Sequence, residues 1–303
     1  AIQSVGTSGG VSGGGRDGIH ANAGTGNIAV GTTGAIGAVT GADEGIELRT
    51  TGAGTIALAT AANVTGLGEW GVYSNAQNGA TTINLTNGSD ITGNTRGLEA
   101  FASGTGAITA NVGAGSVVIG REYGMLTGTG SGIATVNNAG LITSTDAAAD
   151  TGGDAYWAFA GTTLLNNSGT ITGRVHSAGS GLTLTNLAGG VWNPGNGASV
   201  FAAGSDSVIN RGMINIRAGA TNFSGLETFR HETGGTINMQ VGSAPADTLT
   251  VLNFSPAGGA ININFDADAA LGSGDAGTSG TADTIIVTGT VTPVGTSPVN
   301  IAA

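Results

Sequence analysis

The chain contains no cysteine and no lysine, and only 9% of its 303 residues are charged. Without cysteine it can form neither a disulfide framework nor a thiolate nucleophile. The eight basic residues are scattered arginines and the net charge is −11, a balance that disfavours contact with nucleic-acid phosphates. No run of 18 apolar residues is present, so we expect no membrane insertion by this segment.

Recognisable catalytic groups are equally scarce. The absence of lysine removes one common base and charge stabiliser. The three histidines, His20, His176 and His231, belong to no recognisable nucleophile motif, and we expect each to be a solvated side chain on the surface of the fold. The composition therefore predicts a protein that is not an enzyme.

Glycine, by contrast, is abundant, with 59 residues. It recurs before an apolar residue at intervals of 26 or 27 positions, as Gly18-Ile19, Gly45-Ile46, Gly71-Val72, Gly97-Leu98 and Gly124-Met125. A fixed period of this size is the signature of a solenoid, in which each repeat forms one turn of a stacked coil. Glycine also permits positive φ at the tight corners that such a coil needs.

Each repeat contains three short runs in which apolar and polar residues alternate, as in 46–48, 56–58 and 63–65, and again in 72–74, 83–85 and 90–92. Alternation with period two, bounded by turn residues, predicts strands, and no segment carries a helical stripe. The sequence thus predicts an all-β fold, a three-sided right-handed parallel β-helix with about 26 residues per coil. Ile19, Ile46, Val72, Ile83, Leu98 and Met125 are expected to point inward.

The pattern changes along the chain. Residues 1–16 are expected to be an N-terminal cap or frayed start, and residues 17–243 to be coils interrupted by a loop at 145–155. Residues 244–303 are expected to form the C-terminal coils, with a mobile loop at 266–282. An N-x-G-x-I pattern recurs, with doublets at Asn137-Asn138 and Asn166-Asn167 and a single asparagine at Asn210, and we expect these asparagines to stack along the axis.

These repeats, with the D-x-L-x-V and D-x-I-x-V strands at Asp247 and Asp283, resemble passenger domains of Gram-negative autotransporters, of the pertactin and filamentous-haemagglutinin type. The resemblance covers about residues 17–292. It implies a secreted protein at the bacterial cell surface, outside the outer membrane, that acts as an adhesin or a structural rod. The absence of cysteine fits passage of an extended chain through a narrow pore.

The period also predicts a candidate binding face. Positions flanking the anchoring glycine should project outward on one side of the coil and bring together Trp70, Tyr73, Arg96, Glu99, Phe101 and Tyr123. Aromatic rings among polar groups are typical of sugar or protein recognition, so the expected partner is a glycan or protein of a host or neighbouring cell. The alternative is that the rings only stabilise the outer sheet by stacking.

Metal sites are weakly indicated. Asp266, Asp268 and Asp275, with Asp283, could bring carboxylates together near the C-terminus, and Asp146, Asp150 and Asp154 form a second calcium candidate. Neither group matches a known calcium-loop spacing, so we expect no metal and no cofactor. Tyr156, Trp157 and Phe159 are expected to pack internally beneath the 145–155 loop.

Two other functions stay open. The chain could self-associate into a surface layer or filament, or it could be a polysaccharide lyase or hydrolase on the same scaffold. An enzyme requires a concave groove with carboxylates about 5–10 Å apart. An adhesin requires an exposed aromatic or polar strip, and a filament requires a repeating intermolecular contact.

Overall fold

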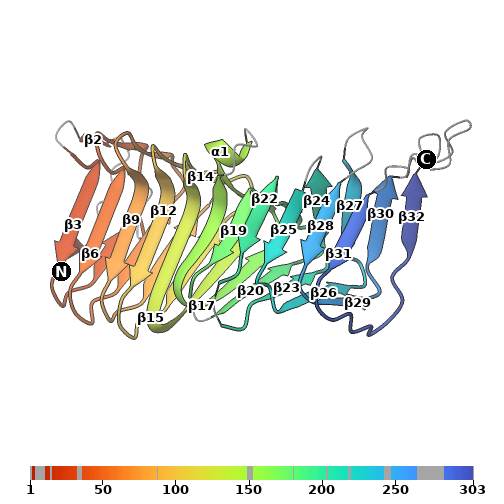
Figure 1. The fold of residues 1–303 in the computed structure, drawn as a ribbon. Helices are drawn as coiled ribbons and strands as arrows, with labels where there is room; N and C mark the ends of the chain where they lie inside the picture. Colours follow the sequence, from red (N-terminus) through yellow and green to blue (C-terminus); the bar gives the residue numbers. More distant parts are fainter. Residues whose placement is uncertain are drawn as a thin grey trace, which may run out of the picture.

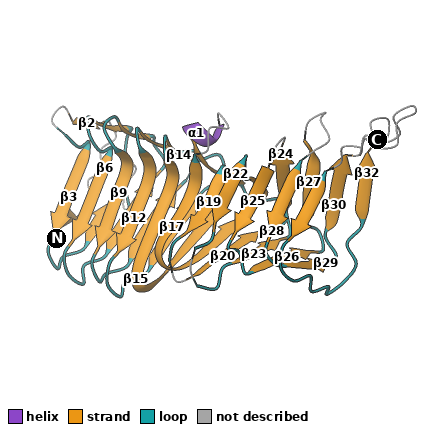
Figure 2. Ribbon diagram, viewed as in Figure 1, coloured by secondary structure: helices purple, strands orange, loops and turns teal. Residues whose placement is uncertain are grey.

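The computed structural model describes residues 2–3, 11–13, 16–32, 36–86, 88–148, 153–179, 181–202, 204–217, 220–241, 247–264 and 283–302. Over these residues the chain winds into a β-solenoid with about 26 residues per turn. The first and last strands lie at opposite ends of the stack (Figure 1). Strands account for almost all of the secondary structure in the described part, and one short helix, α1 (Thr145–Ala148), projects from it (Figure 2). The predicted all-β parallel solenoid is confirmed.

Each turn of the solenoid contributes to three faces. The first face contains β3 (Ile19–Ala23), β6 (Ile46–Thr50), β9 (Trp70–Ala76), β12 (Arg96–Ala102), the first parts of β15 (Tyr123–Asn138) and β17 (Asp154–Asn167), β19 (Arg174–Ser177), β22 (Gly197–Val200), β25 (Ala220–Ser224), β28 (Thr248–Val251) and β31 (Thr284–Val287). A bridge between Ser177 and Phe201 links the last four strands to the rest.

The second face continues from the first around one corner. It contains β1 (Ile2–Gln3), β4 (Ile28–Val30), β7 (Ile56–Thr60), β10 (Thr81–Leu85), β13 (Ile108–Val112), the later parts of β15 and β17, β20 (Gly181–Asn186), β23 (Ser207–Asn210), β26 (Thr228–Glu232) and β29 (Phe254–Ala257).

The third face closes the coil. It contains β2 (Val11–Gly13), β5 (Val39–Gly41), β8 (Val64–Gly66), β11 (Asp90–Gly93), β14 (Val117–Gly120), β16 (Leu141–Ser144), β18 (Thr170–Thr172), β21 (Val191–Asn193), β24 (Met213–Arg217), β27 (Thr236–Val241), β30 (Ala260–Asn264) and β32 (Val299–Ala302).

Pairing between these strands is parallel throughout, with equivalent residues of successive turns opposite one another. Val72 stands between Ile46 and Leu98 on the first face, as the 26-residue period predicts. The runs predicted at 46–48 and 56–58 lie in β6 and β7, and the run at 63–65 overlaps β8 from its second residue onward. Each residue therefore meets its equivalents one period before and after it in the sequence.

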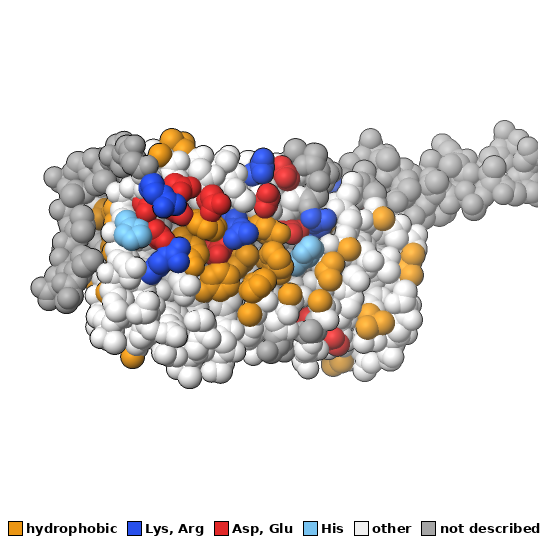
Figure 3. Space-filling model, turned by 60° about the vertical axis from the view of Figure 1, so that its left-hand side comes forward, with side chains coloured by type: hydrophobic (Ala, Val, Ile, Leu, Met, Phe, Trp, Pro, Cys, Tyr) orange, Lys and Arg blue, Asp and Glu red, His pale blue; other side chains and the backbone are white. Residues whose placement is uncertain are grey.

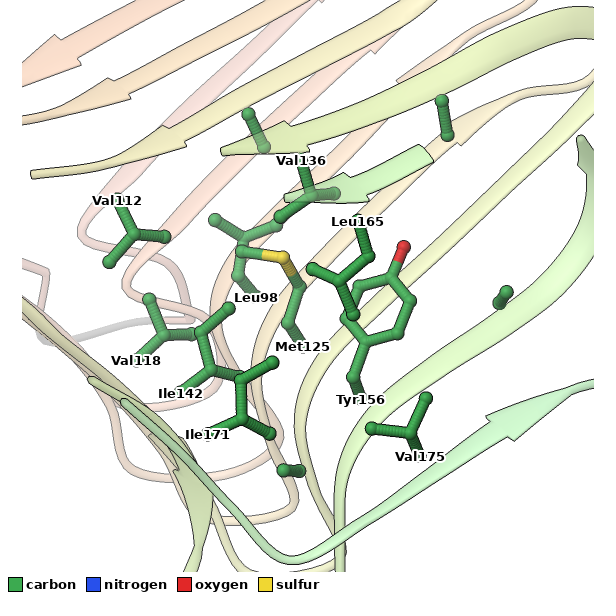
Figure 4. Close-up of a cluster of buried hydrophobic side chains, with 14 of the residues drawn as sticks. Leu98, Val112, Val118, Met125, Val136, Ile142, Tyr156, Leu165, Ile171 and Val175 are labelled. Atoms are coloured by element: carbon green, nitrogen blue, oxygen red, sulfur yellow. The ribbon is translucent and has the colours of Figure 1, made fainter. Parts of the chain in front are cut away.

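The core is a set of apolar ladders inside the coil. The residues predicted to point inward, Ile19, Ile46, Val72, Ile83, Leu98 and Met125, are all at most 7% exposed. Figure 4 shows side chains from the three faces converging, Leu98 and Met125 from the first, Val136 and Leu165 from the second, and Ile142 from the third. No single turn encloses its own apolar residues, so stability is a sum of contacts between neighbouring turns.

The recurring glycines are required because atoms of the neighbouring turn and of the third face lie too close to leave room for a side chain. A Cβ added to Gly71 would lie 2.7 Å from both the carbonyl oxygen of Gly97 and a methyl carbon of Ile91. A Cβ at Gly45 would lie 2.5 Å from the Gly71 carbonyl oxygen, so the constraint repeats with the period. Neither glycine has a positive φ, whereas corner residues such as Gly115 and Gly189 do. The periodic glycine therefore lies where the first and third faces are too close for a side chain.

Asparagine side chains stack along the solenoid axis as predicted, and the asparagines singled out in the sequence lie in two ladders, an outer and an inner one. The outer one joins side-chain amides at 2.7, 2.8 and 3.0 Å, through Asn84, Asn111, Asn137 and Asn166. The inner one is buried and joins them at 2.7, 2.8 and 2.9 Å, through Asn138, Asn167, Asn186 and Asn210. Each asparagine doublet contributes its first residue to the outer ladder and its second to the inner ladder, because successive strand residues point to opposite sides.

The segments expected as a cap and as loops are only partly described. Within 1–16, β1 and β2 already pair with β4 and β5 of the next turn. Within 145–155, α1 precedes residues 149–152, which lie outside the described residues, and Asp154 already begins β17. The expected loop at 266–282 also lies outside the described residues.

The prediction that His231 is a solvated surface side chain is wrong. His231 is 0% exposed and lies where the inner asparagine ladder ends. The Asn210 amide donates to His231 Nδ1 at 3.2 Å, and His231 Nε2 donates to the Ala260 carbonyl oxygen at 2.9 Å. Both ring nitrogens are thereby used by a neutral imidazole, which occupies the next position of the ladder.

Acidification is expected to destabilise the fold through His231. Burial lowers the pKa of His231 below the ordinary 6.5, against the opposing effect of its bond to Ala260. Because the unfolded chain binds the proton first, this contribution to stability is complete above pH 6.5. It falls as the pH drops from 6.5 to the lower pKa of the folded state, by up to about 1.4 kcal/mol per pH unit.

Denaturant unfolding at several pH values on both sides of 6.5 measures this loss. The control is His231→Asn, which continues the ladder with a group that does not titrate. We expect the wild-type protein to lose more stability on acidification than His231→Asn. The neighbouring Glu232 pairs with Arg211 and Arg230 on the outside, and both proteins keep these ion pairs. Identical pH profiles for the two proteins would contradict the prediction.

Candidate functional site

The outward positions of the first face form rows that follow the predicted register. One row contains His20, Glu47, Tyr73, Glu99 and Leu126, in successive turns. Trp70, Arg96 and Tyr123 form a second row along the corner with the third face. The structure therefore brings together all six residues of the predicted binding face, on β9, β12 and β15.

Six rings on this face form what we call the aromatic strip: Trp70, Tyr73, Phe101, Tyr123, Trp157 and Phe159. Ring centroids are 4.9 Å apart for Trp70 and Tyr73, and 5.0 Å apart for Tyr123 and Trp157. Phe159 lies 5.4 Å from Trp157 and 5.8 Å from Phe101 in edge contacts. Hydrophobic side chains gather into one patch among charged groups in the space-filling view (Figure 3).

Two arginines complete the strip. The Arg96 guanidinium lies 5.8 Å from the Trp70 ring and 5.7 Å from the Tyr123 ring, and so joins its two halves. The Arg49 guanidinium lies 4.6 Å over the Tyr73 ring. Cation–π contacts of this kind are attractive, by about 0.5–1 kcal/mol at exposed sites. The strip is therefore a continuous surface that extends over several turns.

Glu99 is a buried carboxylate that contacts two residues at the centre of the strip, Trp70 and Arg96. Its carboxylate accepts a hydrogen bond from Trp70 Nε1 at 2.9 Å and pairs with Arg96. Burial raises the pKa of Glu99, although Arg96 and Trp70 act in the opposite direction. Because Glu99 is only 3% exposed, its role is to position Trp70 and Arg96.

The rings of the strip are less exposed to solvent than the open surface that the sequence predicts. Tyr73 points outward but is only 7% exposed, because Arg49 and Trp70 cover its ring. Phe159 is 46% exposed, and Trp70, Tyr123 and Trp157 are half-buried. Contact with a ligand would therefore involve the half-buried rings and Phe159.

The expectation that Tyr156, Trp157 and Phe159 pack internally is correct for Tyr156 alone. Tyr156 is fully buried, whereas Trp157 stands opposite Leu126 in the outward row. Pairing with β15 skips one residue at Phe159, which is the extra residue of a β-bulge. A bulged residue is left unpaired by the neighbouring strand, and here its ring projects outward onto the strip.

A polar hollow borders the strip. It has a volume of about 270 Å³ and is lined by Arg49, Thr50, Thr51, Asn75, Gln77 and Ser103. Asn75 donates a hydrogen bond to the Tyr73 hydroxyl at 3.0 Å, so the hollow and the strip share residues. Guanidinium, amide and hydroxyl groups next to flat rings can hydrogen-bond the hydroxyls of a ligand that stacks on those rings.

A second cluster, which we call the acidic corner, lies at the N-terminal end of the same face. It consists of Asp17, Asp43, Glu44 and Glu47, together with His20 and the arginines 16 and 49. His20 Nδ1 lies 2.9 Å from Asp17 Oδ2, and Arg49 pairs with Glu47. The side chain of His20 is 49% exposed, so it lies at the surface as predicted but is held by carboxylates.

Burial and crowding of like charges change the protonation of this corner. Burial, reinforced by the nearby Asp17, Asp43 and Glu47, raises the pKa of Glu44 to about 8. Burial also acts to raise the pKa of Asp17, but hydrogen bonds from Glu44 and His20 outweigh it and the pKa is lowered. The two carboxyl groups therefore differ widely in their affinity for a proton.

The acidic corner was not predicted as a cluster, although the sequence contains a signal for it. Asp17 and Glu44 each precede an anchoring glycine, one period apart, and Arg16 and Asp43 each lie one position earlier. Because equivalent positions of successive turns stack on one corner, these four side chains are brought together there.

The aspartates that the sequence offered as calcium ligands lie in several separate places, and some of them lie outside the described residues. Asp266, Asp268 and Asp275 lie outside the described residues, as does Asp150. Asp283 accepts a hydrogen bond from the Asp247 backbone at 3.0 Å. Asp154 is buried and pairs with Arg174 at 2.9 Å and with His176 at 3.4 Å, so it takes part in a row of side chains on the first face.

In the described residues no helix is long and apolar enough to cross a membrane. Comparison of the chain with protein-family models, with curated proteins and with solved structures gives no match.

Proposed function

We propose that this chain is a secreted, non-catalytic solenoid of the autotransporter-passenger type, which acts as an adhesin at the bacterial cell surface. Its aromatic strip would bind a glycan of a host or neighbouring cell. The parallel solenoid supports a rod-like role. The strip supports a binding role, because it is a contiguous set of rings on one face.

The observation that carries this proposal is the combination of the strip with the polar hollow. Flat rings spaced 4.9 to 5.8 Å apart offer stacking surfaces to sugar rings. Arg49, Asn75 and Gln77 in the hollow offer hydrogen-bond donors beside them. A protein partner would fit the rings equally well but would make less use of a small polar hollow.

The fold suggests how weak contacts could give firm attachment. The strip involves β9, β12, β15 and β17, so a chain of sugars lying along the axis would meet several rings in sequence. Linked weak contacts raise the overall affinity because each later contact is intramolecular. A stiff stack of turns keeps these contacts at fixed spacing.

Binding of the purified chain to glycan and matrix-protein arrays tests the proposal. The informative variant is Trp157→Ala with Phe159→Ala, because Tyr73 is covered and Trp70 is bound to Glu99. We expect glycan binding to fall by about tenfold or more, as loss of stacking on two rings implies, with an unchanged circular-dichroism spectrum.

The matched control is Leu67→Ala, which removes an apolar side chain that is 61% exposed and does not belong to the strip. This variant should bind like the wild-type protein. Equal binding by the double variant, or binding to matrix proteins alone, would contradict a glycan site on the strip.

The carbohydrate-active enzyme remains the less favoured function. Its carboxylates would have to come from the acidic corner, where Asp17 and Glu44 have the separated pKa values that acid–base catalysis uses. Glu44 is only 5% exposed, however, and the Asp17 side chain is 9% exposed. Such burial leaves little room for a glycosidic bond between them and supports the non-catalytic proposal.

A further inference from the structure

The acidic corner brings three carboxylates from two successive turns into one cluster. Asp17 precedes β3, and Asp43 and Glu44 precede β6 at the same corner. One carboxylate oxygen from each of the three lies within 4.8 Å of the others. Backbone hydrogen bonds hold the two turns together here, since Gly18 donates to the Glu44 carbonyl oxygen at 3.0 Å and Asp43 donates to that of Arg16 at 2.8 Å.

One oxygen in this cluster has no hydrogen-bond donor. Asp17 Oδ1 is fully buried and has no partner, although the other oxygen of the same carboxylate contacts His20. The Asp17 side chain as a whole is only 9% exposed. A buried carboxylate oxygen without a donor is costly and calls for a partner.

The nearby cations do not supply that partner. Arg49 and His20 both contact Glu47. Arg16 contacts Asp43 at 3.2 Å, and its side chain is 79% exposed, so solvent screens its charge. None of these contacts reaches Asp17 Oδ1.

We propose that Asp17, Asp43 and Glu44 bind a divalent cation of the calcium class. Their ligand atoms are all carboxylate oxygens, which hard cations prefer. The Asp43 side chain is 31% exposed and gives the ion a route from solvent. The alternative set of Asp17, His20 and Glu47 would suit zinc, but Glu47 is already engaged by Arg49 and His20. A bound ion would join β3 to β6 at the end of the first face.

The test is calorimetric titration of the chelator-treated chain with calcium chloride. We expect one site with a dissociation constant of about 10⁻⁴ to 10⁻³ M, because only three protein carboxylates are available and water must complete the shell. Asp17→Asn and Glu44→Gln should each weaken binding by about tenfold or more. Two isosteric variants are used so that a folding defect in one, detected by circular dichroism, still leaves a test.

Asp90→Asn on β11 is the matched control and should bind calcium like the wild-type protein. The proposal would be overturned by an absence of calcium binding in the wild-type chain, by unchanged binding in both carboxylate variants, or by a preference for zinc that His20→Gln removes. Glycan binding by the strip is measured with other variants, so the two proposals fail independently.

Discussion

Replacing Ile83 by Asp is expected to unfold several turns of the solenoid. Ile83 is 0% exposed in β10, where it stands between Leu58 of the preceding turn and Ala110 of the next. The new carboxylate would have no partner in this apolar ladder, at a cost of about 3–5 kcal/mol. Because stability is a sum over neighbouring turns, the damage should spread to the turns stacked on β10. Thermal melts followed by circular dichroism measure the effect.

Thr82→Asp is the control for this experiment. Thr82 is the preceding residue of the same strand, only half-buried, and it points to the opposite side. The same charge placed there should change the free energy of unfolding by about 0.5 kcal/mol or less. Equal melting of the Ile83→Asp variant and the wild-type protein would show that the inward ladder has been assigned incorrectly.

Replacing Trp192 by Ala is expected to have the second largest effect, a loss of about 3–5 kcal/mol. Trp192 is fully buried in β21 and stacks on Phe223 with ring centroids 4.7 Å apart. Its indole Nε1 also donates to the Gly173 carbonyl oxygen at 3.1 Å, and this acceptor would lose its donor. Isoleucine fills the equivalent position of the turns on either side, at Ile171 and Ile214.

Urea unfolding monitored by near-ultraviolet circular dichroism measures the loss, since the stacked pair contributes to that spectrum. Met213→Ala on the neighbouring strand β24 removes a side chain that is 39% exposed, and should cost less than about 1 kcal/mol. A similar cost for both variants would contradict the assignment of Trp192 to the core.

The aromatic strip shows how far the sequence could predict the candidate site. Tyr73 and Glu99 were placed in the right row, but their burial depends on Arg49, Trp70 and Arg96, whose side chains fold over them. Phe159 reaches the strip only because β17 bulges against β15. A bulge changes the side to which a residue points, and no count along the sequence reveals its position.

Turn length is the other feature that the sequence did not define. Residues in the inner asparagine ladder are separated by 29, 19 and then 24 positions, so the period of 26 or 27 ends after the first half of the chain. Stacking nevertheless continues, because each new turn can pair with the last whatever the length of the intervening corner. His231 enters the ladder 21 positions after Asn210, so the period of the first half does not predict its inward position.

The sequence by itself determined the parallel solenoid, and in the regular first half it also determined the order of the strands and the residues that point inward. It could do so because each residue of a solenoid meets residues one period away, and alternation fixes which side chains point inward. The tertiary structure alone decided which outward side chains stay accessible and which charges stay unpaired. Those properties depend on side chains that meet across corners and bulges, as Phe159 and the free oxygen of Asp17 do.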